Sequence, residues 1–118
     1  MVDPGVSVPT RELFQVPELT RNSPPLTIPL FVSGAVTGNA FEPVARARFP
    51  AVAAALDALG DGARLSGSGG SVFKPVDSRE AGTALADACP EGMRVWIVRG
   101  VDESPLRRRL AEWQRERA

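Results

Sequence analysis

The chain has 118 residues, 43% of them hydrophobic and 24% charged, which is typical of one globular domain. Its fourteen basic and fourteen acidic residues cancel, so the charge balance points neither to nucleic acid nor to an anionic membrane as a partner. The sequence has no histidine, which excludes histidine bases and most zinc sites, and its single cysteine, Cys89, cannot form an intramolecular disulfide.

The first predicted segment, residues 1–37, is rich in proline. Because proline fixes φ and restricts the residue before it, we expect mostly extended backbone and turns. One helical turn is predicted over Thr10–Phe14, and an apolar piece follows from Ile28 to Val36, closed by Thr37-Gly38-Asn39. The isolated aromatic ring of Phe14 favours a binding segment that lies across a folded body over a disordered linker.

The second segment, residues 38–103, begins with a predicted helix from Glu42 to Leu59. Pro50 divides it and suits the first turn of a second helical piece, so we expect a kink or a join around Arg48-Phe49. Apolar periodicity predicts one buried face, formed by Val44, Ala47, Arg48, Ala51, Ala55 and Leu59, with Phe49, Val52 and Leu56 alongside.

Two short strands are predicted next, over residues 63–66 and 71–76, joined by the tight linker Gly67-Ser68-Gly69-Gly70. A helix capped by Asp77 or Ser78 then runs to about Ala88.

Residues Arg94–Arg99 form a clear strand pattern that ends at Gly100, with Trp96 expected in the core. The third segment, residues 104–118, is predicted to be an arginine-rich helix or a frayed end. The cluster of Arg107, Arg108 and Arg109, with Arg115 and Arg117, is interspersed with Glu112 and Glu116. This pattern is more typical of a solvated helix face than of a polyanion contact.

The predicted order of the body is therefore helix, strand, strand, helix, strand, and Met1-Val2 is the possible end of one more strand. This order indicates a single α+β domain over residues 1–118. Its expected architecture is a ferredoxin-like split βαβ sandwich, with helices packed on one face of a mostly antiparallel sheet.

The compartment follows from features that the sequence lacks. The amino-terminal residues have no basic start followed by an apolar run, and no apolar stretch reaches the roughly eighteen residues of a membrane span. Cys89 precedes Pro90 at a predicted helix end, which favours a small packing residue over a nucleophile. We therefore expect a soluble, cytoplasmic domain, and we predict no metal site in it.

Two groups of residues are candidates for a binding site. The turn Gly67-Ser68-Gly69-Gly70 can adopt positive φ and bring backbone N–H groups close to a phosphate. It fits neither the P-loop nor the Rossmann template, because it joins two strands, and by itself it is more typical of a flexible hairpin turn. Thr10 offers a hydroxyl and Phe14 a ring for a planar ligand, although Phe14 alone is as well explained by packing of its turn onto the core.

Four motifs, taken in order, favour a binding role over a purely structural one for these residues. They are PGVSVPTRELF from Pro4, NAFEPV from Asn39, SGSGGSVF from Ser66 and VRGVDESPL from Val98. In order and spacing the series resembles the second half of the 4-diphosphocytidyl-methylerythritol kinases, a family of the GHMP kinase superfamily. The resemblance covers essentially the whole chain.

The resemblance implies a GHMP kinase C-terminal domain. It implies an enzyme that uses ATP, with Mg²⁺, to phosphorylate the 2-hydroxyl of cytidine-diphosphate-linked methylerythritol in non-mevalonate isoprenoid biosynthesis. Phe14 then matches an aromatic that stacks on cytosine, and Thr10 matches a hydroxyl of the same substrate wall. The Gly67-Ser68-Gly69-Gly70 turn matches the superfamily's third motif, beneath the site of phosphate transfer. On this basis we favour the binding interpretation for both groups.

The chain also departs from the family pattern. No PxxxGLGxxS-type ATP loop occurs between Met1 and Ala118, so we expect the chain alone to be catalytically incomplete and to need an N-terminal kinase domain as its partner. Arg11 stands where the family often has a small or apolar residue. The alternative hypothesis is a stand-alone, non-catalytic small-molecule binding module of ferredoxin-like fold.

Overall fold

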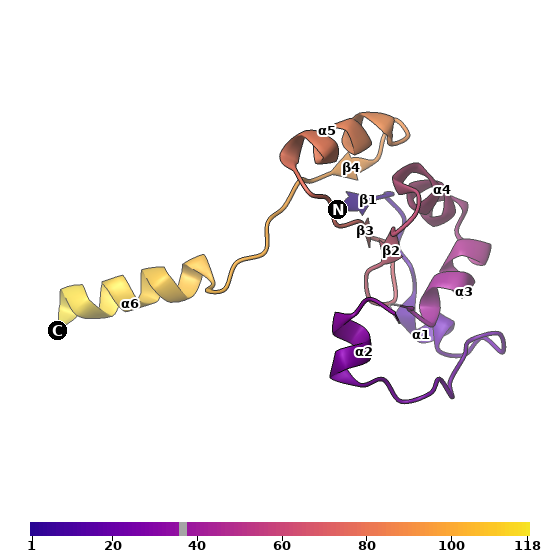
Figure 1. Cartoon of the computed structure of the whole chain (residues 1–118), viewed down its shortest axis with the longest axis horizontal. Helices are drawn as coiled ribbons and strands as arrows, with labels where there is room; N and C mark the ends of the chain where they lie inside the picture. The colour runs from indigo at the N-terminus through magenta and orange to yellow at the C-terminus, as the bar shows by residue number, and fades with distance from the viewer. Residues whose placement is uncertain (36–37) are drawn as a thin grey trace.

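A computed structural model describes residues 1–35 and 38–118 of the chain (Figure 1). Its helices and strands follow the predicted order. In chain order they are β1 (Val2–Asp3), α1 (Thr10–Leu13), α2 (Ile28–Val32), α3 (Phe41–Arg48), α4 (Pro50–Leu59), β2 (Arg64–Leu65), β3 (Val72–Phe73), α5 (Arg79–Ala88), β4 (Arg94–Val95) and α6 (Pro105–Arg117).

The four strands form one antiparallel sheet in the order β2-β3-β1-β4. Val2 pairs with Val72 on one side and with Val95 on the other, so the strand that comes first in the chain occupies the middle of the sheet. Because β3 lies between β1 and β2, the arrangement is a split βαβ unit. The predicted α+β fold with a mostly antiparallel sheet is therefore confirmed.

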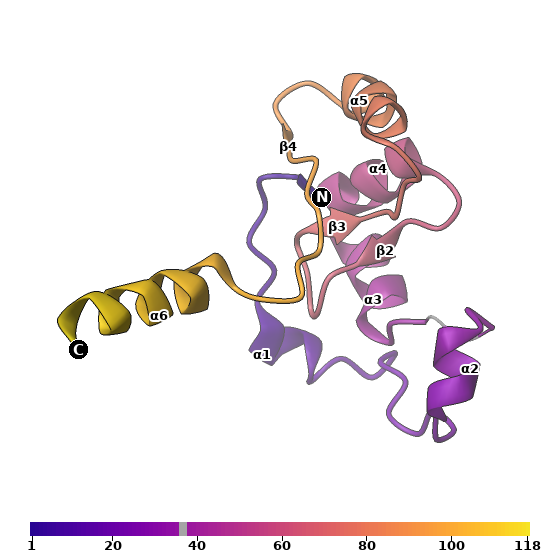
Figure 2. The ribbon, with the colours of Figure 1, turned by 60° about the vertical axis from the view of Figure 1, so that its left-hand side comes forward.

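One face of the sheet carries the main core. Side chains alternate between the faces of a strand, so Val2, Leu65 and Val72 share the face on which α4 packs. There they meet the buried side chains of α3 and α4. The helix α5 lies beside α4, as the ribbon in Figure 2 shows. The fully or nearly fully buried members of this core are Val2, Ala45, Val52, Ala55, Leu56, Leu59, Leu65 and Val72.

The predicted join between two helical pieces is confirmed at Phe49, whose φ of −124° and ψ of 93° are extended. Pro50 occupies the first turn of α4, where its missing N–H costs nothing. The join also explains an error in the predicted buried face. Ala47 and Arg48 are exposed while Ala45 is buried. The prediction extended one helical periodicity over both α3 and α4, but the two helices have different axes.

The predicted helix cap at residues 77–78 is confirmed at Ser78, whose hydroxyl accepts a hydrogen bond from Ala81 N at 3.1 Å. The following strand is shorter than predicted. β4 ends at Val95, although Trp96 N still donates to Met1 O at 2.9 Å. The prediction of Trp96 as a core residue is wrong, because Trp96 is 46% exposed. Its neighbour Val95 packs against the core, and side chains alternate along an extended strand.

The proline-rich segment forms a second, smaller core on α3. Leu13, Val16 and Leu19 are buried against Val44, so the segment lies across the body as expected. The apolar piece predicted from Ile28 begins with α2, whose side chains are exposed. Its predicted end, at Val36 and Thr37, lies outside the described residues.

The tail forms the helix α6, which projects away from the rest of the molecule (Figures 1 and 2). Ser104 caps it, and Arg117 lies over the ring of Trp113, with the guanidinium carbon 4.2 Å from the ring centre. Of the two alternatives for this segment, the helix is observed.

Candidate functional site

The structure brings together two of the groups that the sequence singled out. The hydroxyl of Thr10, at the start of α1, lies 2.6 Å from the hydroxyl of Ser68 in the glycine-rich turn. The Thr10 side chain is available for this contact because it does not cap its own helix. Thr10 and Ser68 thus form one polar surface from residues that lie far apart in the sequence.

Glycine is required in the turn because the proline-rich segment passes very close to it. A Cβ atom on Gly70 would lie 2.6 Å from the carbonyl oxygen of Val6, and one on Gly69 would lie 3.2 Å from the side chain of Val8. Gly67 and Gly69 also have φ values of +57° and +109°, which side-chain-bearing residues rarely adopt. The turn between β2 and β3 is therefore held against residues 6–8 and is not free in solvent.

Asn39 fastens the other side of the turn. Its side-chain amide donates to the carbonyl oxygens of Leu65 at 3.0 Å and Gly67 at 2.7 Å, while its side-chain oxygen accepts from Phe41 N at 2.9 Å. Glu42 adds a hydrogen bond from Leu65 N to its carboxylate at 2.9 Å. The start of α3 is thereby joined to the turn through side chains.

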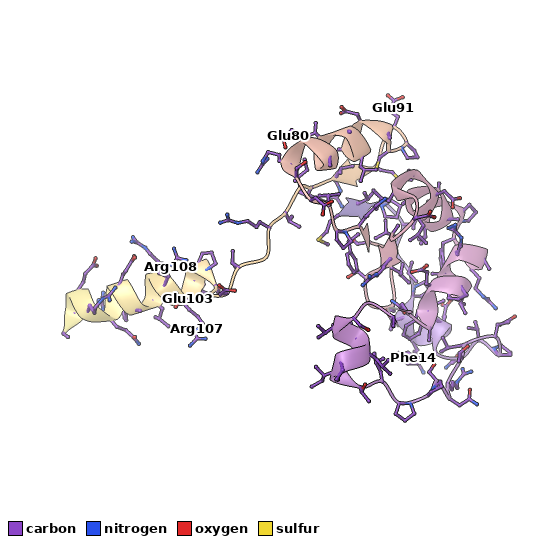
Figure 3. All side chains as sticks on the ribbon, in the orientation of Figure 1. Phe14, Glu80, Glu91, Glu103, Arg107 and Arg108 are labelled. Carbon is purple, nitrogen blue, oxygen red and sulfur yellow. The ribbon has the colours of Figure 1, made fainter. Side chains whose placement is uncertain are left out.

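Phe14 lies at the end of α1, with 57% of its surface exposed. Its ring meets Phe41 edge to face, with ring centres 4.9 Å apart and planes at 87°. This geometry is favourable for an aromatic pair and leaves much of the Phe14 ring open (Figure 3). A planar, uncharged ring system is the kind of group that such a surface can stack.

The site offers hydroxyls, backbone groups and an aromatic surface.

Two titratable groups elsewhere have shifted pKa values. A hydrogen bond from Gly5 N, supported by the Arg94 side chain, lowers the pKa of Asp3. Burial raises the pKa of the Cys89 thiol, which donates to Leu85 O at 3.3 Å, as expected for a packing residue.

The arginine cluster of the tail lies apart from this site. Figure 3 shows Arg107 and Arg108 on α6, well separated from Phe14. Arg108 is paired with Glu103 at 3.8 Å and Arg109 with Glu112 at 3.2 Å, as in a solvated helix face. In residues 1–35 and 38–118 no three histidine, cysteine or acidic side chains are grouped in a way that could hold a metal ion. No helix in the same residues is long and apolar enough to cross a membrane.

Sequence reasoning assigned no role to Asn39 or Phe41, although both contact the residues of the site. Asn39 and Phe41 were noted only as members of a motif. The spacing from Asn39 to Phe41 contained a signal, since asparagine side chains readily accept hydrogen bonds from backbone two residues on. Their long-range contacts depend on the tertiary fold.

Comparison with known proteins places the chain in a family. Residues 17–95 match the family model described as GHMP kinases C terminal. A protein of Xylella fastidiosa named 4-diphosphocytidyl-2-C-methyl-D-erythritol kinase is 46% identical over 108 residues, which cover 90% of this chain and 36% of that protein. A protein of the same name from Xanthomonas axonopodis pv. citri is 45% identical over 108 residues, which cover 90% of this chain and 37% of that protein. The chain thus spans little more than a third of the length of these relatives.

Proposed function

Because this chain belongs to the family of GHMP kinase C-terminal domains, we propose that it is the substrate-side half of an ATP-dependent kinase. The substrate is 4-diphosphocytidyl-2-C-methyl-D-erythritol, and the phosphate goes to its 2-hydroxyl, a step of non-mevalonate isoprenoid biosynthesis in the cytoplasm. The names of the two relatives and their identity of about 45% support this substrate.

One observation carries the proposal: the hydrogen bond between Thr10 and Ser68. It joins a hydroxyl assigned to the substrate wall with the turn assigned to the phosphate side. In the proposed complex, cytosine stacks on the exposed ring of Phe14, and Thr10 contributes a hydroxyl to the same wall. Gly67-Ser68-Gly69-Gly70 lies beneath the transferred phosphate and orients the groups around it.

ATP and Mg²⁺ are proposed to be held mainly by an N-terminal GHMP kinase domain. The described residues contain no group of three acidic, histidine or cysteine side chains that could hold a metal ion, so we assign the Mg²⁺ ligands to that domain. Phosphoryl transfer depends on charge neutralisation around the phosphates, so the chain alone is expected to be inactive. Its role is to bind and orient the sugar-nucleotide substrate.

A chimera tests the proposal directly. The matching third of the Xylella fastidiosa kinase is replaced by this chain, and ATP-dependent phosphorylation of the cytidyl substrate is followed by ³¹P NMR. We expect activity in the chimera and none in the isolated chain. Phe14→Ala in the chimera should raise KM by about tenfold, since a base–aromatic stack contributes about 1–3 kcal/mol. Gln15→Ala, an exposed neighbour, serves as the matched control.

The possible outcomes separate the two hypotheses. A folded but inactive chimera would contradict the proposal. Phosphorylation of the substrate by the isolated chain would contradict the expectation that this chain is inactive without the N-terminal domain. Tight binding of the cytidyl substrate by the isolated chain, together with an inactive chimera, would instead support the stand-alone binding module.

A further inference from the structure

Arg21 makes three hydrogen bonds to the backbone that carries Phe14. Its guanidinium donates to the carbonyl oxygen of Phe14 at 2.5 Å, of Val16 at 3.0 Å and of Leu19 at 3.0 Å. The planar guanidinium group has five N–H donors, so it can donate hydrogen bonds to several carbonyl oxygens at once. The ammonium group of lysine does this less well. Arg21 therefore closes the chain from Phe14 to Leu19 into a compact loop.

This loop is attached to the body unevenly. Leu13, Val16 and Leu19 are buried against α3, whereas the Phe14 ring is exposed and meets the Phe41 ring edge to face. The helix α1, which ends at Leu13 just before Phe14, has only four residues, so few of its own hydrogen bonds hold its last turn. Cationic side chains stabilise helix ends of this kind by binding the last carbonyl groups.

We propose that Arg21 is a positioning residue that fixes the Phe14 ring for stacking on the substrate base. The inference rests on the proposed function of Phe14 as the stacking aromatic. Without the guanidinium, the buried side chains still hold the loop to α3. The carbonyl oxygen of Phe14, however, loses its hydrogen bond from Arg21. The ring then samples orientations other than the edge-to-face contact with Phe41, and a base must order it on binding.

The test uses the whole chain carrying Arg21→Gln, with Arg21→Lys as the conservative variant. Arg79→Gln, at an exposed arginine of α5, is the matched control. Two properties are measured: the NMR nuclear Overhauser contacts between the Phe14 and Phe41 rings, and the affinity for cytidine 5′-diphosphate by calorimetry. Amide hydrogen exchange at Val52 and Val72 reports whether the core is intact.

We expect the ring contacts of Arg21→Gln to weaken and its affinity to fall by about three- to tenfold, with core exchange unchanged. Arg21→Lys should be intermediate and Arg79→Gln unchanged. If Arg21→Gln does not fold, the lysine variant carries the same comparison.

Unchanged ring contacts in a folded Arg21 variant would overturn the inference and leave Arg21 with a role in stability only. If the wild-type chain itself does not bind the cytidine probe, the proposed function is contradicted. The ring contacts still decide the role of Arg21 in that case, so the two failures are distinguishable.

Discussion

Among single residues, Asn39 makes hydrogen bonds that connect two parts of the site. It is the residue that ties the glycine-rich turn to the start of α3, and Phe41 extends this connection to Phe14. A change at Asn39 therefore affects both the phosphate side and the base side of the proposed site.

Replacement of Asn39 gives a graded prediction. Asn39→Ala removes three hydrogen bonds and should lower the free energy of unfolding by about 1–3 kcal/mol. Asn39→Asp should be more damaging, because its carboxylate would face the carbonyl oxygens of Leu65 and Gly67 that now accept from the amide. Urea denaturation measures both variants, with Asn22→Ala, at an exposed asparagine, as control. An aspartate variant as stable as the wild type would contradict the assigned contacts.

The roles of some single residues could be predicted from the sequence, and those of others could not. Thr10, Phe14 and the glycine turn were singled out because their residue types and spacing suggest chemistry. Arg21 and Asn39 act through backbone carbonyls that no local pattern identifies, since any residue can supply a carbonyl. Their partners became known only with the fold.

Among the elements, the turn between β2 and β3 is constrained by a close approach of the backbone of residues 6–8. It lies against residues 6–8, so the proline-rich segment and the hairpin position each other. Any side chain at Gly70 would have to push the Val6 backbone away.

Gly70→Ala is accordingly expected to lower the free energy of unfolding by about 1–3 kcal/mol, as other forced overpacking does. Gly100→Ala is the matched control, because a Cβ atom there meets nothing within 4 Å and Gly100 has no positive φ. Thermal unfolding of both variants provides the measurement. Equal midpoints for Gly70→Ala and Gly100→Ala would show that the close approach is not maintained in solution.

Secondary structure was more predictable than burial. Proline punctuation predicted the join at Phe49, and the cap at Ser78 was expected from its hydroxyl. The exposure of Ala47 and Trp96 was not predicted. For Ala47 it depends on the relative directions of the two helices at the join, and for Trp96 on which face of the sheet is covered. Those properties arise from tertiary packing, which single-sequence periodicity does not contain.

At the scale of the whole molecule, α6 sets the shape. The radius of gyration is 17.6 Å, whereas a compact domain of this length should have about 13.5 Å. The longest dimension, 56 Å, reflects the projecting helix (Figure 1). Leu106 and Trp113 are correspondingly exposed on it.

Removal of residues 104–118 should therefore leave the core intact. We expect a change of less than about 0.5 kcal/mol in the free energy of unfolding, as for surface changes in general. The radius of gyration in X-ray scattering should fall to about 13 Å. Trp113→Ala in the full chain is the matched control and should be equally neutral. A clear loss of stability on truncation would mean that α6 docks onto the body in solution.

The position of β1 in the middle of the sheet has a consequence for the order of assembly. Val2 must pair with Val72 and Val95, both of which leave the ribosome long after it. The helices α3 and α4 can form early from local contacts, but the sheet closes only when β4 has been made. Between the synthesis of β1 and that of β4 the strand Val2–Asp3 therefore lacks its sheet partners, a period in which chaperones or neighbouring nascent chains can reach it.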